Sequence, residues 1–128
     1  MGENAELVRE ALAAWLGGDT ERAAQSVHPD VVSIRMPPIP DPQTYYGVAG
    51  IQQMYDDWTA QFGDFEMEPF EFLDAGDFVV VGMIQRGTGK ASGASVAGRF
   101  WFVFTIADGK VTRQEVYNSR DEALEATG

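Results

Sequence analysis

Five large apolar residues follow one another from Phe100 to Phe104, within the stretch GRFWFVFTIADGK. Successive side chains of a strand point to opposite faces, so a strand built from this run is apolar on both faces. Each of the two faces then has to be covered by another layer of protein. What covers them determines the architecture.

The second half of the chain alternates with a period of two, which predicts four strands in a meander. In the first of these, Phe65 and Met67 are in phase, but Phe70 and Phe72 are out of phase with them. The change falls at Pro69, so this strand is predicted to carry a bulge. The expected strands are 65–73, 78–86, 99–106 and 110–118, with the Asp108-Gly109 turn as a strong hairpin signal before the last and a short polar helix or tail over 119–128.

The first half is predicted to be mainly helical. Apolar residues recur at three- and four-residue steps over 4–16 and 48–62, which is typical of amphipathic helices. Asp19 can cap a short helix from Thr20 to about Val27, which the His28-Pro29 pair ends. The remaining segments are a strand over 31–36 and an irregular loop over 37–46, which holds four of the six prolines.

The order of these elements indicates an α+β domain, with helices packed on one face of a curved, mainly antiparallel sheet. The 128 residues fit one domain, 1–128. Twenty acidic and nine basic residues give a net charge of −11, which disfavours nucleic acid and anionic membrane surfaces as partners. No apolar segment is long enough to span a membrane, so we expect a cytoplasmic protein.

Cysteine is absent and His28 is the only histidine, so a closed transition-metal site is not expected and stability should be insensitive to chelators. His28 lies close to Asp30 in the sequence and is a tempting catalytic residue. A histidine at a helix end more often meets the helix dipole, however, and Asp30 is more often a turn residue. We therefore predict structural roles for both, and no cofactor.

Four stretches of the chain carry a resemblance to a known family: AAWLGGD, HPDVV, YYGVAGIQQMYDDW and DGKVTRQEVYNSRDEALEATG. The chain resembles the nuclear transport factor two-like superfamily and, within it, the SnoaL-like group. The resemblance implies a cone: a curved mixed sheet, mainly antiparallel, wrapped around three helices and an apolar pocket. Members include isomerases, cyclases, epoxide hydrolases, dehydratases and non-catalytic binders, so fold does not fix function.

The catalytic residues of these relatives are not matched. The general-base aspartate of the ketosteroid isomerases would fall near Arg35 or Met36, and their oxyanion tyrosine near Ala11. Their second oxyanion acid would fall near Trp101, and the buried aspartate of the epoxide hydrolases corresponds to Val116. The histidine that SnoaL cyclases carry in the later strands has no counterpart. No catalytic residue is therefore assigned.

Candidate ligand contacts follow from the expected helix faces and strand alternation. Tyr45 and Tyr46 either reach the pocket or pack beside Gly47, and an arginine on a buried strand needs an acid or a ligand anion. By resemblance to the isomerases, the last strand turns Gln114, Val116 and Asn118 inward. The expected ligand-binding set is Trp15, Arg35, Met36, Tyr45, Tyr46, Met54, Trp58, Met83, Arg99, Trp101, Gln114, Val116 and Asn118, several of which could instead be plain core.

The resemblance also implies a homodimer through the convex sheet face, with Tyr117 in the interface; the alternative cover for that face is the segment from Ser119 onward. Trp58 and Trp101 are expected to face each other across the pocket. A bulge after Gly98 would instead turn Phe100 and Phe102 inward.

Two functions of different class fit the sequence. One is a metal-independent enzyme that isomerises, cyclises, dehydrates or hydrolyses a small hydrophobic molecule. The other is a non-catalytic dimeric binder of such a molecule. A buried carboxylate with a raised pKa in the pocket would favour the enzyme, and a lining of apolar residues, phenols and amides would favour the binder.

Overall fold

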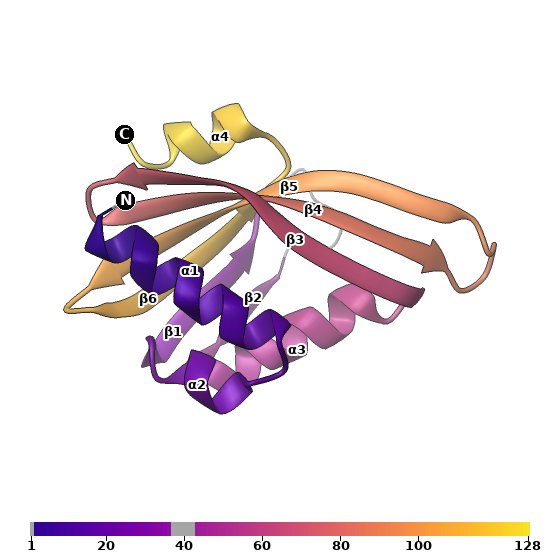
Figure 1. The fold of residues 1–128 in the computed structure, drawn as a ribbon, viewed down its shortest axis with the longest axis horizontal. Coiled ribbons are helices and arrows are strands. Elements are labelled where there is room, and N and C mark those ends of the chain that lie inside the picture. The colour runs from indigo at the N-terminus through magenta and orange to yellow at the C-terminus, as the bar shows by residue number, and fades with distance from the viewer. Residues whose placement is uncertain (1, 37–42) are drawn as a thin grey trace.

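The computed structural model describes residues 2–36 and 43–128. A six-stranded sheet, in the order β2-β1-β6-β5-β4-β3, curves around three helices and does not close (Figure 1). Only β1 and β6 pair in parallel; the other neighbours are antiparallel. The α+β class, the mixed sheet and the cone shape predicted from the sequence are thus confirmed. The helices are α1 (Glu3–Leu16), α2 (Thr20–Ala24), α3 (Gly47–Thr59) and α4 (Arg120–Glu125), and the strands are β1 (Val27–Arg35), β2 (Thr44–Tyr46), β3 (Phe62–Ala75), β4 (Phe78–Gly89), β5 (Ser95–Ala107) and β6 (Lys110–Tyr117).

Several element boundaries differ from those predicted. The second helix ends at Ala24, and β1 begins at Val27 with a register irregularity between Val27 and Val32. The backbone N–H of Asp30 donates to Nδ1 of His28 within this irregularity. Residues 44–46, expected to be loop, form a short strand against β1, while 37–42 of the same predicted loop lie outside the described residues.

The bulge predicted in β3 is present. Pro69 pairs with Met83 and Glu71 with Gly82, which leaves Phe70 as the extra residue. The bulge returns Phe72 to the same core cluster as Phe65 and Met67, while Phe70 packs on the opposite face.

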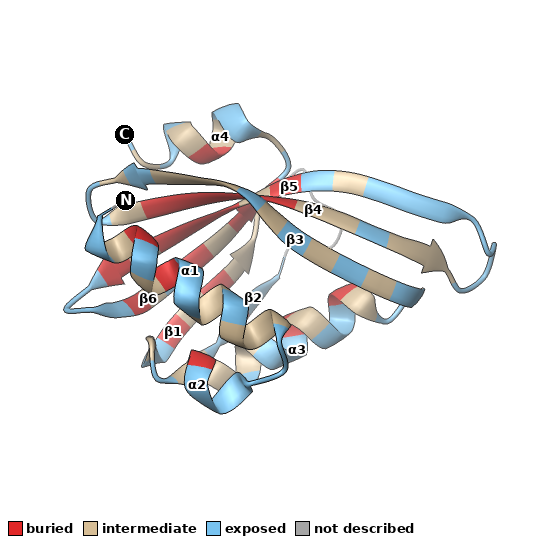
Figure 2. Cartoon of the chain, in the orientation of Figure 1, coloured by how far each residue is buried: buried red, intermediate tan, exposed pale blue. Residues whose placement is uncertain are grey.

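The aromatic strand β5 is covered on both faces, as its sequence requires. Its concave side carries Phe100, Phe102 and Phe104, which belong to the main core below α1 and α3. Its convex side carries Trp101 and Val103, which pack with Val80, Tyr117 and residues of α4. Buried residues concentrate on the central strands β4, β5 and β6 (Figure 2).

The short helix α4 lies on the convex side, opposite the other three helices (Figure 1). Ser119 caps it by accepting a hydrogen bond from the backbone N–H of Glu122, and Ala123 is fully buried. The segment from Ser119 onward, which was the alternative cover for the convex face, therefore covers part of that face. No helix in the described part of the chain is long and apolar enough to cross a membrane.

Candidate functional site

An apolar cavity of about 90 Å³ lies between the helices and the concave face of the sheet. Helices contribute most of the lining, and strands β1, β3, β5 and β6 contribute the rest. The lining residues are Val8, Ala11, Leu12, Trp15, Leu16, Ala23, Ala24, Val27, Val48, Ile51, Met54, Tyr55, Trp58, Met67, Phe102, Phe104, Val111 and Gln114.

Helical periodicity explains why α1 and α3 present these side chains together. Leu12 and Trp15 of α1 and Ile51 and Tyr55 of α3 recur at three- and four-residue steps, so each helix turns one apolar stripe toward the sheet. The rings of Trp15 and Tyr55 meet edge to face, with centroids 6.1 Å apart. This aromatic contact joins the two helices at the cavity wall.

Trp58 is held by both a polar and an aromatic contact. Its indole Nε1 donates a hydrogen bond of 2.7 Å to Oε1 of Gln85 on β4. Its ring centroid lies 4.6 Å from that of Phe100. With only 9% of its surface exposed, the ring has a defined position at one end of the cavity.

Gln114 brings an amide to an otherwise apolar lining. It lies on β6, where strand alternation turns Gln114 and Val116 inward as predicted. Ser33, on β1, is the register partner of Gln114. Its buried Oγ has no hydrogen-bond partner among the described residues. Polar groups on this part of the concave face are therefore sparse and incompletely paired.

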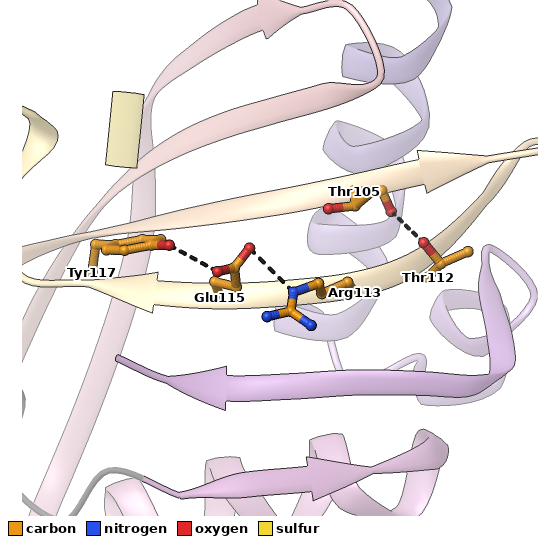
Figure 3. A network of polar contacts seen from close by, with 5 residues as sticks. All are labelled: Thr105, Thr112, Arg113, Glu115 and Tyr117. Carbon is orange, nitrogen blue, oxygen red and sulfur yellow. Dashed lines mark hydrogen bonds and ion pairs between the residues drawn. The ribbon is translucent and has the colours of Figure 1, made fainter. Parts of the chain in front are cut away.

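The outward-facing residues of β6 form a separate polar network (Figure 3). The phenol of Tyr117 donates to Oε2 of Glu115 at 2.8 Å, and Oε1 of Glu115 lies 3.3 Å from Nε of Arg113. Burial raises the pKa of Tyr117, and the hydrogen bond and charge of Glu115 raise it further. This network lies on the convex side, away from the cavity.

Tyr45 has a raised pKa on the concave side. Burial is the main cause, and the carboxylate of Asp57, which accepts a 2.8 Å hydrogen bond from the phenol, adds to it. The nearby positive charge of Arg35 partly opposes the rise in the pKa of Tyr45. Tyr45 belongs to the core cluster but does not line the cavity.

The thirteen residues predicted to bind ligand fall into four groups. Of these, Trp15, Met54, Trp58 and Gln114 line the cavity. Four more, Arg35, Tyr45, Met83 and Val116, face the same side of the sheet without reaching the lining. Met36, Arg99 and Trp101 pack on the convex side, whereas Tyr46 and Asn118 are exposed.

The expected position of Trp101 across the cavity from Trp58 is wrong. Trp101 contacts Phe70 on the convex face, with ring centroids 6.1 Å apart, and Phe100 takes the place next to Trp58. The cause is a bulge at Thr112. Thr105 pairs with Arg113 while Ile106 pairs with Val111, so the register between β5 and β6 shifts by one residue. The hydroxyl of Thr112 donates to the carbonyl oxygen of Thr105 across this shift (Figure 3).

Sequence reasoning missed the lining residues of α1 other than Trp15, and those of α2 and β5. The helical stripe of Val8, Ala11 and Leu12 was a usable signal, because it continues directly to Trp15. On β5, the two-residue spacing of Phe100, Phe102 and Phe104 was a second signal, because it puts all three rings on one face of the strand. For the small residues Ala23 and Ala24 the sequence carries no comparable signal.

His28 is exposed and makes a local backbone contact, in keeping with a structural role. Within residues 2–36 and 43–128, no group of three or more histidine, aspartate or glutamate side chains could hold a metal ion. The described lining of the cavity contains no aspartate, glutamate, histidine, lysine or arginine. Its chemistry is that of hydrophobic contact, one phenol and one amide.

Known structures share this architecture. TerC, co-crystallised with polyporic acid, is 26% identical, with 98% of each chain covered and a TM-score of 0.78. An NTF2-like protein from Burkholderia thailandensis is 20% identical over 100% of this chain and 99% of its own, with a TM-score of 0.80. A protein with a ketosteroid isomerase-like fold from Catenulispora acidiphila, in complex with trimethylamine, is 19% identical over 96% of this chain and 92% of its own, with a TM-score of 0.71.

No curated protein matches the chain. The family model described as the SnoaL-like domain matches residues 8–114, a range that contains every residue lining the cavity. The resemblance inferred from the sequence is thus confirmed: the chain belongs to the SnoaL-like domain family and has the NTF2-like fold.

Proposed function

We propose that the protein is a non-catalytic binder of a small, mostly apolar molecule with an aromatic ring, held in the cavity between α1, α3 and the sheet. The observation that carries the proposal is the lining: aliphatic and aromatic side chains with a single amide, Gln114. Pockets for small molecules are usually apolar with a few polar groups that orient the ligand. The rings of Trp15 and Trp58 offer flat surfaces for such a ligand.

A ligand of about one ring fits the cavity when side chains of the lining move. Its volume of about 90 Å³ is smaller than that of an engineered apolar cavity of about 150 Å³ that admits benzene. Met54 and Met67 line it, and methionine side chains are flexible enough to make room. TerC, the 26% identical relative, was crystallised with polyporic acid, which supports small-molecule binding by this chain.

The lining favours a binder over an enzyme. Proton transfer requires an acid or base within hydrogen-bond reach of the reacting group. The residues described around the cavity supply only the phenol of Tyr55 and the amide of Gln114 as polar side chains besides the Trp15 and Trp58 indoles. The isomerase, cyclase, dehydratase or hydrolase activities found in related proteins therefore have less support here than binding.

The test is to fill the cavity and measure binding of a neutral ring. ¹⁹F NMR with 4-fluorobenzamide would report binding to the wild-type protein. Ala11→Leu adds bulk inside the cavity and should weaken binding about tenfold or more, whereas Ala13→Leu on the exposed side of the same helix should not change it. Equal binding by both variants, or no binding to the wild type, would contradict the proposal.

We further propose that two copies associate through the convex face. Phe70, on β3, is a large apolar residue that remains 40% exposed on this face. Trp101 lies next to Phe70, and α4 covers only the part of the face around Val80 and Val103. A second copy would bury the rest of this apolar surface.

A further inference from the structure

A set of polar side chains adjoins the cavity on the concave face. Ser33 and Arg35 follow Val31 at two-residue steps on β1, so all three point to the core side. Ser33 pairs in register with Gln114 of β6, which lines the cavity. The guanidinium carbon of Arg35 lies 5.5 Å from the centroid of the Trp58 ring, which also lines it. Arg35 and Ser33 are therefore one side chain removed from the cavity.

Two buried polar atoms of this set have no hydrogen-bond partner among the described residues. Ser33 is fully buried, and neither its Oγ nor the buried Nε of Arg35 has a hydrogen-bond partner among the described residues. Leaving buried donors unpaired is costly, and buried polar groups are nearly always paired. A natural explanation is that an acceptor arrives with a ligand.

The charge of Arg35 points to the kind of acceptor. In the described part of the chain, no carboxylate lies within salt-bridge distance of Arg35. Asp57, whose charge acts on the same phenol of Tyr45 as that of Arg35, already accepts hydrogen bonds from Tyr45 at 2.8 Å and Gln53 at 2.7 Å. An arginine beside an apolar cavity is matched best by an anionic oxygen, which forms short, charge-assisted hydrogen bonds.

We infer that the ligand of the cavity is an aromatic acid, whose ring lies between Trp15 and Trp58 and whose anionic oxygen binds Arg35, with Ser33 and Gln114 as further hydrogen-bond donors. This inference rests on the proposed function, because it assigns one end of the same ligand. It also explains how a chain with net charge −11 can retain an acid: the attraction is local and comes from one arginine that has no carboxylate within salt-bridge distance among residues 2–36 and 43–128. The guanidinium of Arg35 lies over the Trp58 ring, so its positive charge is beside the proposed position of the ligand ring.

The experiment compares two probes of nearly the same shape, 4-fluorobenzoate and 4-fluorobenzamide, by ¹⁹F NMR at pH 7. The wild-type protein should bind the acid about tenfold or more tightly than the amide. Arg35→Met should abolish that preference, and an unchanged far-UV circular dichroism spectrum would show that the variant is folded. The matched control is Arg99→Met: Arg99 also lies over an aromatic ring, that of Phe70, but on the convex side, so the preference should remain.

The outcomes separate the two proposals. In one outcome the amide binds and Ala11→Leu blocks that binding, but the acid does not bind more tightly than the amide. In another, the acid still binds more tightly in Arg35→Met. In either case the acid subsite is wrong and the binding function stands. If neither probe binds the wild type, both proposals fail. Should Arg35→Met not fold, Arg35→Gln is the replacement, and equal wild-type affinity for the two probes would overturn the inference without any variant.

Discussion

The indole nitrogen of Trp58 donates a 2.7 Å hydrogen bond to the side-chain oxygen of Gln85, which ties helix α3 to strand β4 beside the cavity. The contact matters for function because Trp58 has no other described polar partner and its ring forms one wall of the cavity. Packing against Phe100 restricts the position of the Trp58 ring, and the hydrogen bond to Gln85 fixes the orientation of the indole.

We expect Gln85→Leu to lower the free energy of unfolding by about 1 kcal/mol, because the N–H of Trp58 loses its acceptor. Trp58→Phe combined with Gln85→Leu should cost less than the sum of the single changes, since both partners are then removed. Urea denaturation of the four proteins gives the coupling energy. Strict additivity would show that the hydrogen bond contributes nothing.

Replacing Trp58 should also weaken binding. Trp58→Ala is expected to reduce the affinity for 4-fluorobenzamide by about 1–3 kcal/mol, because a ring surface against the ligand is lost. Tryptophan fluorescence provides a second measurement. Trp15 and Trp58 line the cavity and Trp101 does not, so Trp101→Phe should keep the ligand-induced change in emission. A change that disappears in Trp101→Phe would place the ligand on the wrong face of the sheet.

Gly82 is expected to tolerate no side chain. A Cβ at this position would lie 2.7 Å from the Phe70 ring and 3.0 Å from Nε1 of Trp101. Gly82→Ala should therefore cost about 1–3 kcal/mol of unfolding free energy through overpacking. Gly98→Ala is the matched control on the neighbouring strand, because its Cβ would meet nothing closer than 3.8 Å. Equal stability of the two variants in urea would argue against the packing of Phe70 over Gly82.

Stability should fall at alkaline pH. The pKa values of Tyr45 and Tyr117 are raised in the folded protein, chiefly by burial. Above the unfolded pKa of about 10, the unfolded chain loses these phenolic protons while the folded chain keeps them, so unfolding becomes more favourable as pH rises. Below that pH the contribution is fully present. Tyr117→Phe should flatten the loss of unfolding free energy between pH 9 and 11, and an unchanged slope would contradict this assignment.

The proposed dimer can be tested by sedimentation equilibrium at tens of micromolar. Phe70→Lys should shift the protein to monomer, because an exposed apolar residue of the convex face becomes charged. Ala13→Lys on the exposed side of α1 serves as the control. A wild-type monomer under these conditions would refute the dimer and leave the cavity proposal untouched.

The predictable part of this fold is the part that local patterns encode. The stripes of α1 and α3, the Asp108-Gly109 turn and the bulge near Pro69 were all readable, because each depends on residues close together in the sequence. The orientation of β5 was not readable. A plain continuation from the turn would place Val103 opposite Gln114, and Trp101 would then face inward. The extra residue Thr112 reverses which residues of β5 face inward, and the sequence around Thr112 contains no signal for a bulge.

The site was recovered in part for the same reason. Trp15, Met54, Trp58 and Gln114 were found because their helix faces and the parity of β6 are regular. Strand β2 and the outward position of Met36 depend instead on pairing between segments that are distant in the sequence. Such pairing is a tertiary effect that single-sequence periodicity does not contain.

The parallel pairing of β1 with β6 has a consequence for how the protein is made. These strands come from opposite ends of the chain, yet Ser33 and Gln114, on either side of this seam, belong to the same part of the concave face. During synthesis β1 emerges long before β6, so this pairing cannot form until β6 has left the ribosome. Long-range pairing of this kind slows folding. A nascent or C-terminally truncated chain would therefore have no binding site, and ligand could select only finished molecules.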